Sequence, residues 1–249
     1  MFRRWILCLQ GRKSLNIAAM QVPVQFEFQS DQTFDSFFPG NNVEILEQLR
    51  GLAAKNQEQQ IFIWGERGSG KSHLLQACCQ QAKTFGKDPF YLAFTRDELP
   101  PPTILEGLES LDMVCFDDLQ HIAGDMEWQH GLFNFYNCHR QNNHQLLLAA
   151  DCPPKYLQFE LPDLKTRMSW GLTLKIKSLR DDQLVAALTH KAHFLGFDIP
   201  AAVGRYLLNH YVHDLPALWL LLEKIDRATL AAQRKLSIPF LKKILADEP

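Results

Sequence analysis

Short apolar runs alternate with longer amphipathic stretches through the middle of the chain. The runs cover residues 61–64, 90–94, 113–116, 146–150 and 172–176. Stretches with apolar residues at helical spacing lie between them, at residues 72–85, 104–111, 128–142 and 162–168. Short buried strands that alternate with helices are typical of a mainly parallel sheet covered on both faces. We therefore predict an α/β domain built on a five-stranded sheet flanked by helices.

The two ends of this pattern mark the expected domain boundaries. A helix at residues 43–54, capped by Asn41 or Asn42, precedes the first run. After about Arg180 no further strand-like run occurs, and helical spacing continues over residues 182–195, 199–212, 215–234 and 238–246. We expect an N-terminal tail at residues 1–32, an α/β domain at 33–179 and a small all-helical domain at 180–249.

Composition and charge narrow the class of protein. The sequence has 26 Lys and Arg residues against 28 Asp and Glu residues, a formal net charge of -2. This balance lacks the basic excess of proteins that bind DNA non-specifically. No apolar run reaches the length of about 18 residues that a membrane span needs, and the apolar run at residues 5–9 is shorter than a secretory signal core. We expect a cytoplasmic protein without a membrane partner, in which residues 1–19 are an untranslated upstream stretch or a loose tail.

The strongest chemical signal is the segment from Gly65 to Ser72. Its sequence, Gly-Glu-Arg-Gly-Ser-Gly-Lys-Ser, fits the pattern G-x-x-x-x-G-K-[ST] between an expected strand and an expected helix. Glycines allow a tight loop whose backbone N–H groups point at phosphate oxygens, and the helix adds its positive N-terminal dipole. Lys71 would place a charge on the terminal phosphates and Ser72 would offer a hydroxyl to Mg²⁺. The segment therefore predicts a site for ADP or ATP with Mg²⁺, and a Gly-rich surface turn is the plain alternative.

Three carboxylates follow expected strands. Asp117 and Asp118 end the run at 113–116, at the strand edge where open α/β sheets bind ligands. Asp117 would hold Mg²⁺, and Asp118 would orient or activate the attacking water. Asp151 follows the run at 146–150 and would lie near the terminal phosphate if that strand neighbours the loop strand. The alternatives are a polar turn for Asp117 and Asp118, and an N-cap or turn residue before Pro153 for Asp151.

Several strings together resemble the AAA+ superfamily and, within it, the bacterial replication initiator DnaA, over about residues 33–245. Residues 33–37, Thr-Phe-Asp-Ser-Phe, resemble the entry segment beside the adenine pocket. Residues 70–75 resemble the loop-to-helix junction, residues 117–124 the metal-binding strand end, and residues 164–171 the segment that carries an arginine finger. With the loop motif, the resemblance implies an AAA+ core with a helical lid. The implied nucleotide contacts are Phe38, Pro39, Gly65, Arg67, Gly68, Ser69, Gly70, Lys71, Ser72 and His73.

Arg167 is the residue to which the resemblance gives a role in another subunit. An arginine finger projects into a neighbour's nucleotide site, where it stabilises charge on the transferred phosphoryl group and raises the rate by about 10³–10⁵. The alternative is a helix-end arginine that makes surface pairs. The family pattern also has a second arginine, sensor 2, in the third lid helix, whereas the aligned residue here is Pro216. A weak or absent intrinsic ATPase activity, with ADP bound structurally, is consistent with this departure.

The resemblance is specific for Hda, the subfamily of stand-alone regulators that inactivate DnaA. We expect no DNA-reading domain, since the chain stops at Pro249, and residues 226–241 are especially Hda-like. Residues 21–26 match the subfamily's sliding-clamp peptide at Gln21, Val24 and Phe26, but Pro23 and Gln25 depart from its usual form. A disordered leader or an edge strand is the alternative for this segment.

The expected function is therefore negative regulation of chromosome replication initiation. Bound to ADP and to the DNA polymerase III sliding clamp (beta subunit), the protein would promote hydrolysis of DnaA-bound ATP. It would contact DNA indirectly through the clamp, associate with the nucleoid in this way, and could form a homodimer. A DNA-binding AAA+ ATPase such as a helicase loader is the first alternative, and it predicts tight intrinsic DNA binding. A P-loop kinase, the second, predicts a small-molecule pocket and no need for an arginine in a neighbour's site.

Overall fold

Five strands form one parallel sheet. The computed structural model describes residues 31–55, 59–180, 182–210 and 215–246. Its strands are β1 (Gln60–Trp64), β2 (Pro89–Ala93), β3 (Met113–Asp117), β4 (Gln145–Ala150) and β5 (Leu172–Lys175). Their order across the sheet is β2-β3-β4-β1-β5, and every neighbouring pair is parallel. The predicted sheet is confirmed, with strand bounds within one residue of those expected.

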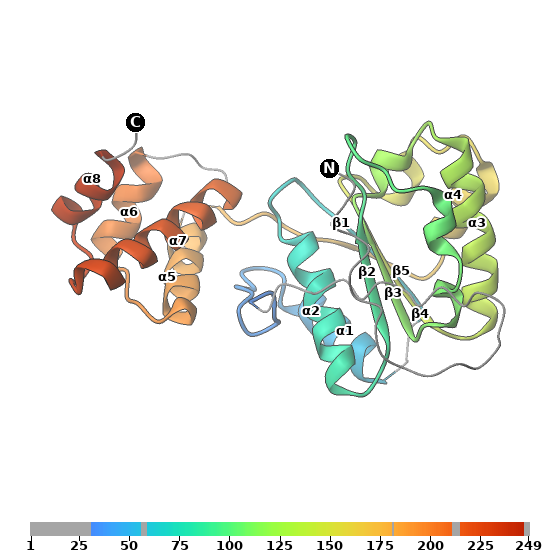
Figure 1. The fold of residues 1–249 in the computed structure, drawn as a ribbon, viewed down its shortest axis with the longest axis horizontal. Coiled ribbons are helices and arrows are strands. Elements are labelled where there is room, and N and C mark those ends of the chain that lie inside the picture. The colour runs from blue at the N-terminus through green and yellow to red at the C-terminus, as the bar shows by residue number, and fades with distance from the viewer. Residues whose placement is uncertain (1–30, 56–58, 181, 211–214, 247–249) are drawn as a thin grey trace, which may run out of the picture.

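Helices cover both faces of this sheet. Figure 1 shows α1 (Val43–Lys55) and α2 (Lys71–Thr84) on one face, and α3 (Met126–Gln141) and α4 (Pro162–Met168) on the other. Because side chains alternate along a strand, Ile61 and Ile63 of β1 enter the core under α1 and α2, and Phe62 enters the core under α3. Burial on both sides explains why the strands read as continuous apolar runs.

Two local expectations were wrong in detail. Residues 104–111 do not form one helix, because Gly107 has a φ of 86° and separates two short 3-10 turns, η1 (Pro102–Leu105) and η2 (Leu108–Ser110). Asn42 directly precedes α1, but its side chain does not cap that helix. It binds the backbone of Lys177, donating to the carbonyl at 2.9 Å and accepting from the N–H at 2.8 Å. Asn42 therefore fixes the chain beyond β5.

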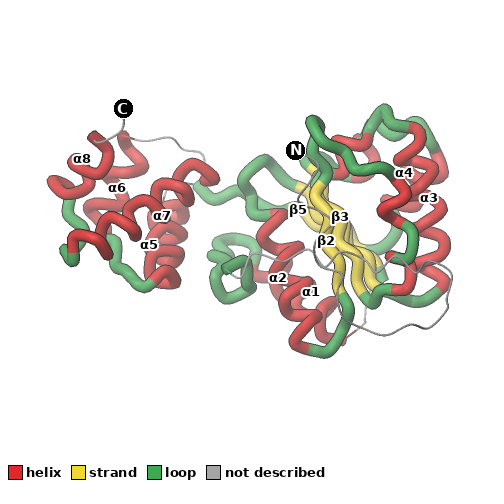
Figure 2. Tube along the Cα trace, viewed as in Figure 1, coloured by secondary structure: helices red, strands yellow, loops and turns green. Residues whose placement is uncertain are grey.

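The described part of the C-terminal domain consists of the helices α5 (Asp182–Leu195), α6 (Ala201–His210), α7 (Leu215–Ala232) and α8 (Ile238–Ala246). They enclose a core of their own that includes Leu188, Leu207, Leu222, Ile225 and Leu241, all without exposed surface. Figure 2 shows this bundle beside the α/β domain, as the sequence predicts. Within the described ranges, every helix falls short of the length and apolarity that a membrane crossing requires.

Gly171 ties the start of β5 to β1, and its replacement tests this packing. Its φ is 77°, and a Cβ there would clash with the carbonyl oxygen of Gln60. Gly86 has a similar φ of 74° but no atom within 4 Å of an added Cβ. Gly86→Ala should cost about 1–2 kcal/mol, the penalty for an L residue in the left-handed region, and Gly171→Ala should cost clearly more. Urea unfolding measures both, and equal losses would contradict this packing.

Candidate nucleotide-binding site

The predicted phosphate loop follows β1 and leads into α2. Gly68 and Gly70 have φ values of 78° and 95°, a region in which L side chains are strained. A Cβ added to Gly70 would lie 2.5 Å from the Phe37 ring, and one added to Gly65 would lie 2.8 Å from the carbonyl oxygen of Ile176. Glycine at these positions therefore lets the backbone approach its neighbours, and a ligand, closely.

Lys71 begins α2 and is 6% exposed. Its Nζ donates to the carbonyl oxygens of Gly65 at 2.9 Å and Glu66 at 3.1 Å, so the ammonium group lies across the loop. The buried Oγ of Ser69 has no hydrogen-bond partner among the described residues. A buried ammonium, an unpaired hydroxyl and the N-terminus of α2 together fit an oxygen-rich anion such as phosphate.

Asp117 ends β3 and is fully buried. Its two oxygens accept hydrogen bonds from the Tyr91 hydroxyl at 3.0 Å and the Asp118 N–H at 2.9 Å. Burial and then the nearby Asp118 carboxylate raise the pKa of Asp117, while hydrogen bonds from Ser72 and Tyr91 and the charge of Lys71 lower it. Asp117 and Ser72 are thus neighbours, and they fit Mg²⁺, which prefers a carboxylate and hydroxyl oxygens alongside phosphate.

Gln120 forms hydrogen bonds with both Asp118 and Asp151. Asp118, directly before the turn η3 (Leu119–Ile122), has a φ of 56°, uncommon for a residue other than glycine. Gln120 donates to the Asp118 carboxylate at 2.9 Å and accepts from the N–H of Asp151 at 3.2 Å. Asp151 follows β4, which pairs with β1, so the condition for placing Asp151 near the loop is met. Gln120 lies within residues 117–124, but no local signal in the sequence marked its bridging position.

These residues surround a cleft of about 900 Å³. The predicted residues that line it are Phe38, Arg67, Gly68, Ser69, Gly70, Lys71, Ser72, His73, Asp118 and Asp151. Pro39, Gly65 and Asp117 do not line it. The loop after β2 adds Arg96 and Asp97, which no motif marked. The structure therefore brings most of the predicted nucleotide contacts together in one cavity.

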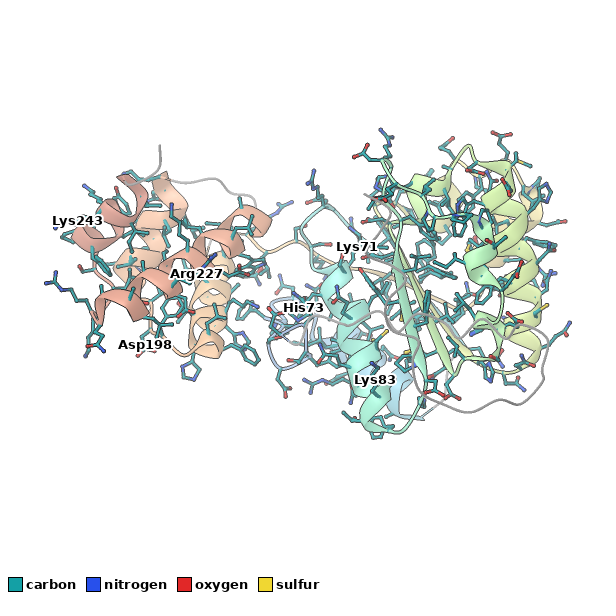
Figure 3. The ribbon with its side chains drawn as sticks, in the orientation of Figure 1. Lys71, His73, Lys83, Asp198, Arg227 and Lys243 are labelled. Atoms are coloured by element: carbon teal, nitrogen blue, oxygen red, sulfur yellow. The ribbon has the colours of Figure 1, made fainter. Side chains whose placement is uncertain are left out.

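The helical domain forms the opposite wall, through Ala187 and Lys191 of α5 and Trp219 and Glu223 of α7. Figure 3 shows Lys71 and His73 on the side of the α/β domain that faces these helices. Lys191 makes a 2.8 Å ion pair with Asp31, and the rings of His190 and Phe38 meet edge to face at 5.9 Å. The segment at residues 31–38 thus lies between the two domains.

His73 fastens this segment to α2. Its Nε2 lies 2.7 Å from the carbonyl oxygen of Thr33 and 3.2 Å from the Ser36 hydroxyl. Because a carbonyl oxygen can only accept a hydrogen bond, Nε2 must be the donor, and the ring is therefore protonated at Nε2. Burial lowers the pKa of His73 to about 4, opposed by the Thr33 hydrogen bond. His73 is therefore a neutral donor at physiological pH.

Arg167 lies outside the cleft, near the end of α4. Its guanidinium carbon is 4.6 Å from the ring centroid of Trp170, 5.6 Å from Phe133 and 5.7 Å from Tyr136. The side-chain amide of Gln60, the first residue of β1, donates to the carbonyl of Arg167 at 3.1 Å. Gln60 therefore fixes Arg167 at the N-terminal end of β1, whereas the phosphate loop follows the C-terminal end.

Two further sequence expectations concern other parts of the chain. Pro216 is the second residue of α7. Further along the same helix, Trp219 and Glu223 line the cleft. The predicted clamp residues Gln21, Val24 and Phe26 lie outside the described residues.

Two family models match different parts of the chain. Residues 103–175 match the bacterial DnaA ATPase domain, and residues 181–245 match the lid domain of Hda. Domain III of the replication initiation protein DnaA from Thermotoga maritima is 20% identical, with a TM-score of 0.74 over 89% of this chain and 98% of that one. AMPPCP-bound DnaA from Aquifex aeolicus is 23% identical, with a TM-score of 0.68 over 80% and 66%. The Holliday junction branch migration motor RuvB from Thermotoga maritima is 14% identical, with a TM-score of 0.62 over 86% and 71%.

At these identities the solved structures establish the fold, and the two family models add the subtype. The chain has the fold of DnaA domain III, and it combines a region that matches the DnaA ATPase domain with a lid that matches that of Hda. These matches are consistent with an Hda-like AAA+ protein and support a relation to the proteins of replication initiation.

Replacement of Lys71 tests the phosphate loop. Lys71→Ala removes the buried ammonium and should weaken binding of a fluorescent ADP analogue roughly 10- to 150-fold, as expected for one hydrogen bond to a charged group. Lys83→Ala, which removes the same charge from the last turn of the same helix, is the matched control and should leave affinity unchanged. Equal affinity in the two variants would contradict this assignment.

The neutral His73 predicts a pH dependence of stability. The unfolded state takes up a proton near pH 6.5, but folded His73 does so only near pH 4. The free energy of unfolding should therefore fall as pH drops from 6.5 to 4, with up to about 1.4 kcal/mol per pH unit from this residue. His73→Gln keeps an N–H donor and should flatten the slope in urea titrations, whereas His130→Gln, at an exposed position, should not. An unchanged slope in His73→Gln would refute the assignment.

Proposed function

We propose that this protein, with ADP in its own cleft, promotes hydrolysis of ATP bound to DnaA and so inactivates the initiator. The observation that carries the proposal is the position of Arg167. Its backbone is held at the N-terminal end of β1 by Gln60, and its own nucleotide loop follows the C-terminal end. At about 3.3 Å per residue, β1 separates these ends by roughly 13 Å. Arg167 is therefore suited to another molecule's nucleotide.

The charge of Arg167 is also available to a partner. Among the residues that the structure describes, no carboxylate lies within ion-pair distance of its guanidinium group. Aromatic rings contact the guanidinium group but leave its charge unneutralised. An unpaired arginine that a partner's phosphates can reach is what phosphoryl-transfer activation in trans requires.

In the complex that we propose, water attacks the γ-phosphorus of the ATP on DnaA. The bond between the γ-phosphorus and the bridging β–γ oxygen breaks, ADP and inorganic phosphate are formed, and a proton of the attacking water is released to solvent. Arg167 stabilises the negative charge that develops on the transferred group and on the leaving oxygen. This protein supplies no covalent step and is unchanged at the end.

The protein's own cleft favours a structural nucleotide. Arg67, Gly68, Ser69, Gly70 and Lys71 would hold the phosphates, with Mg²⁺ between Ser72 and Asp117. Asp118 and Asp151 would orient water near the terminal phosphate. The lid, however, lines this cleft with Trp219 and the Glu223 carboxylate, and Lys191 is paired with Asp31. Together with Pro216 at the expected position of sensor 2, a carboxylate on the lid wall supports ADP as the resident nucleotide and a weak intrinsic ATPase activity.

The remaining partners rest on the sequence resemblance. We propose that Gln21, Val24 and Phe26 dock on the DNA polymerase III sliding clamp, through which the protein reaches DNA and the nucleoid in the cytoplasm. We also propose functional units at residues 33–179 and 180–249, and a homodimer through the face that carries Arg167. The Hda-type lid and the DnaA-type ATPase domain support these assignments.

Hydrolysis of ATP bound to DnaA tests the proposal, with clamp-loaded DNA and ADP present. The wild type should accelerate hydrolysis, and Arg167→Ala should lose most of an effect of about 10³ or more. Arg227→Ala removes the same charge from an exposed position on α7 and should behave as the wild type. If the wild type itself gives no acceleration, the regulatory proposal fails, and tight binding of single-stranded DNA would then favour a helicase loader.

A further inference from the structure

Trp170 lies between two arginines of the α3–α4 face. It is 38% exposed and is the second residue after α4, which ends at Met168. The guanidinium carbon of Arg167 lies 4.6 Å from its ring centroid, and that of Arg140, from α3, lies 4.9 Å from the same centroid. Tyr136 meets the Trp170 ring edge to face at 6.3 Å. One indole ring therefore contacts two guanidinium groups from two different helices.

Such a ring restrains an arginine that has no carboxylate partner in the described part of the chain. A free arginine side chain samples many rotamers, and fixing it in one costs about 2 kcal/mol of conformational entropy. An interaction of a free arginine with another molecule would have to offset this cost. A guanidinium group can contact an aromatic ring through the flat face of the guanidinium group. The N–H groups at the edge of the guanidinium group then remain available for hydrogen bonds. Trp170 can thus fix Arg167 while its donors stay available to phosphate.

The backbone beneath this contact is fixed by a second set of bonds. Gln60 donates to the carbonyls of Arg167 and Met168 at 3.1 and 3.2 Å and accepts from the Tyr136 hydroxyl at 2.7 Å. Arg140 in turn donates to the Tyr136 oxygen at 3.1 Å. Arg140 therefore contacts both the tyrosine that is bonded to Gln60 and the ring that contacts Arg167.

We propose that Trp170 is a positioning residue for Arg167, and that Arg140 supports it by holding the other side of the α3–α4 contact. The role of Arg167 toward another molecule's nucleotide rests on the proposed function, but the ordering of its side chain does not. The inference therefore has a test on this protein alone and a second test in the complex.

The first test measures the order parameter of the Arg167 Nε–Hε bond by ¹⁵N relaxation, with the signal assigned by its loss in Arg167→Lys. It should exceed roughly 0.6 in the wild type, fall below that value in Trp170→Ala, and recover in part in Trp170→Phe. Tyr156→Ala is the matched control, because Tyr156 is another exposed ring with a cation, Lys155, 4.7 Å from its centroid. An order parameter that is unchanged in Trp170→Ala would overturn the inference, whatever the function of Arg167.

The second test measures hydrolysis of DnaA-bound ATP over a range of concentrations of this protein. Trp170→Ala should lower the maximal acceleration about two- to fivefold, as a cation–π contact at an exposed site implies, and leave the half-saturating concentration unchanged. Arg140→Gln should do the same more weakly, and Trp170→Phe should restore part of the loss. A rise in the half-saturating concentration alone would make Trp170 a partner contact and refute positioning. If Arg167→Ala has no effect in this assay, the proposed function fails, and the relaxation measurement still decides the inference.

Discussion

β1 pairs with both β4 and β5, and this position inside the sheet places both the nucleotide cleft and Arg167. At its C-terminal end this pairing aligns the phosphate loop with Asp151 after β4 and with Ile176 after β5. At its N-terminal end it brings Gln60 to the carbonyl of Arg167, five residues before β5 begins at Leu172. The nucleotide cleft and Arg167 thus lie at opposite ends of one buried strand, which keeps them apart.

The helical domain completes the cleft through a small number of polar contacts. The Lys191–Asp31 ion pair and the His73–Thr33 hydrogen bond both act on the segment at residues 31–38, which lies between the domains. A nucleotide in the cleft would contact this segment, the loop and the lid together. Its binding would therefore favour one arrangement of the lid, because it interacts with all three parts only when they are close.

The sequence predicted features that depend on local spacing. Apolar runs identified the five strands, and the spacing of glycines, Lys71 and Ser72 identified the phosphate loop. It did not predict contacts between distant residues, such as the bond from Gln60 to Arg167, the bridge from Gln120 to Asp151, or Arg96 in the cleft. The expectation that Asn42 caps α1 was also wrong. A side chain that can cap a helix can equally bind the backbone after a strand, and only tertiary packing selects between these partners. Gly107 ended the expected helix at 104–111 for a local reason, its left-handed backbone.

We propose that Arg167 recognises a phosphoryl group on another molecule. The decisive test is binding of this protein to DnaA loaded with ADP and aluminium fluoride, which mimic the transferred group. Clamp-loaded DNA would be present, and binding to DnaA with ADP alone would be the reference. The wild type should bind the mimic complex more tightly than the reference, and Arg167→Ala should bind both equally. A preference for the mimic that persists in Arg167→Ala would contradict the account.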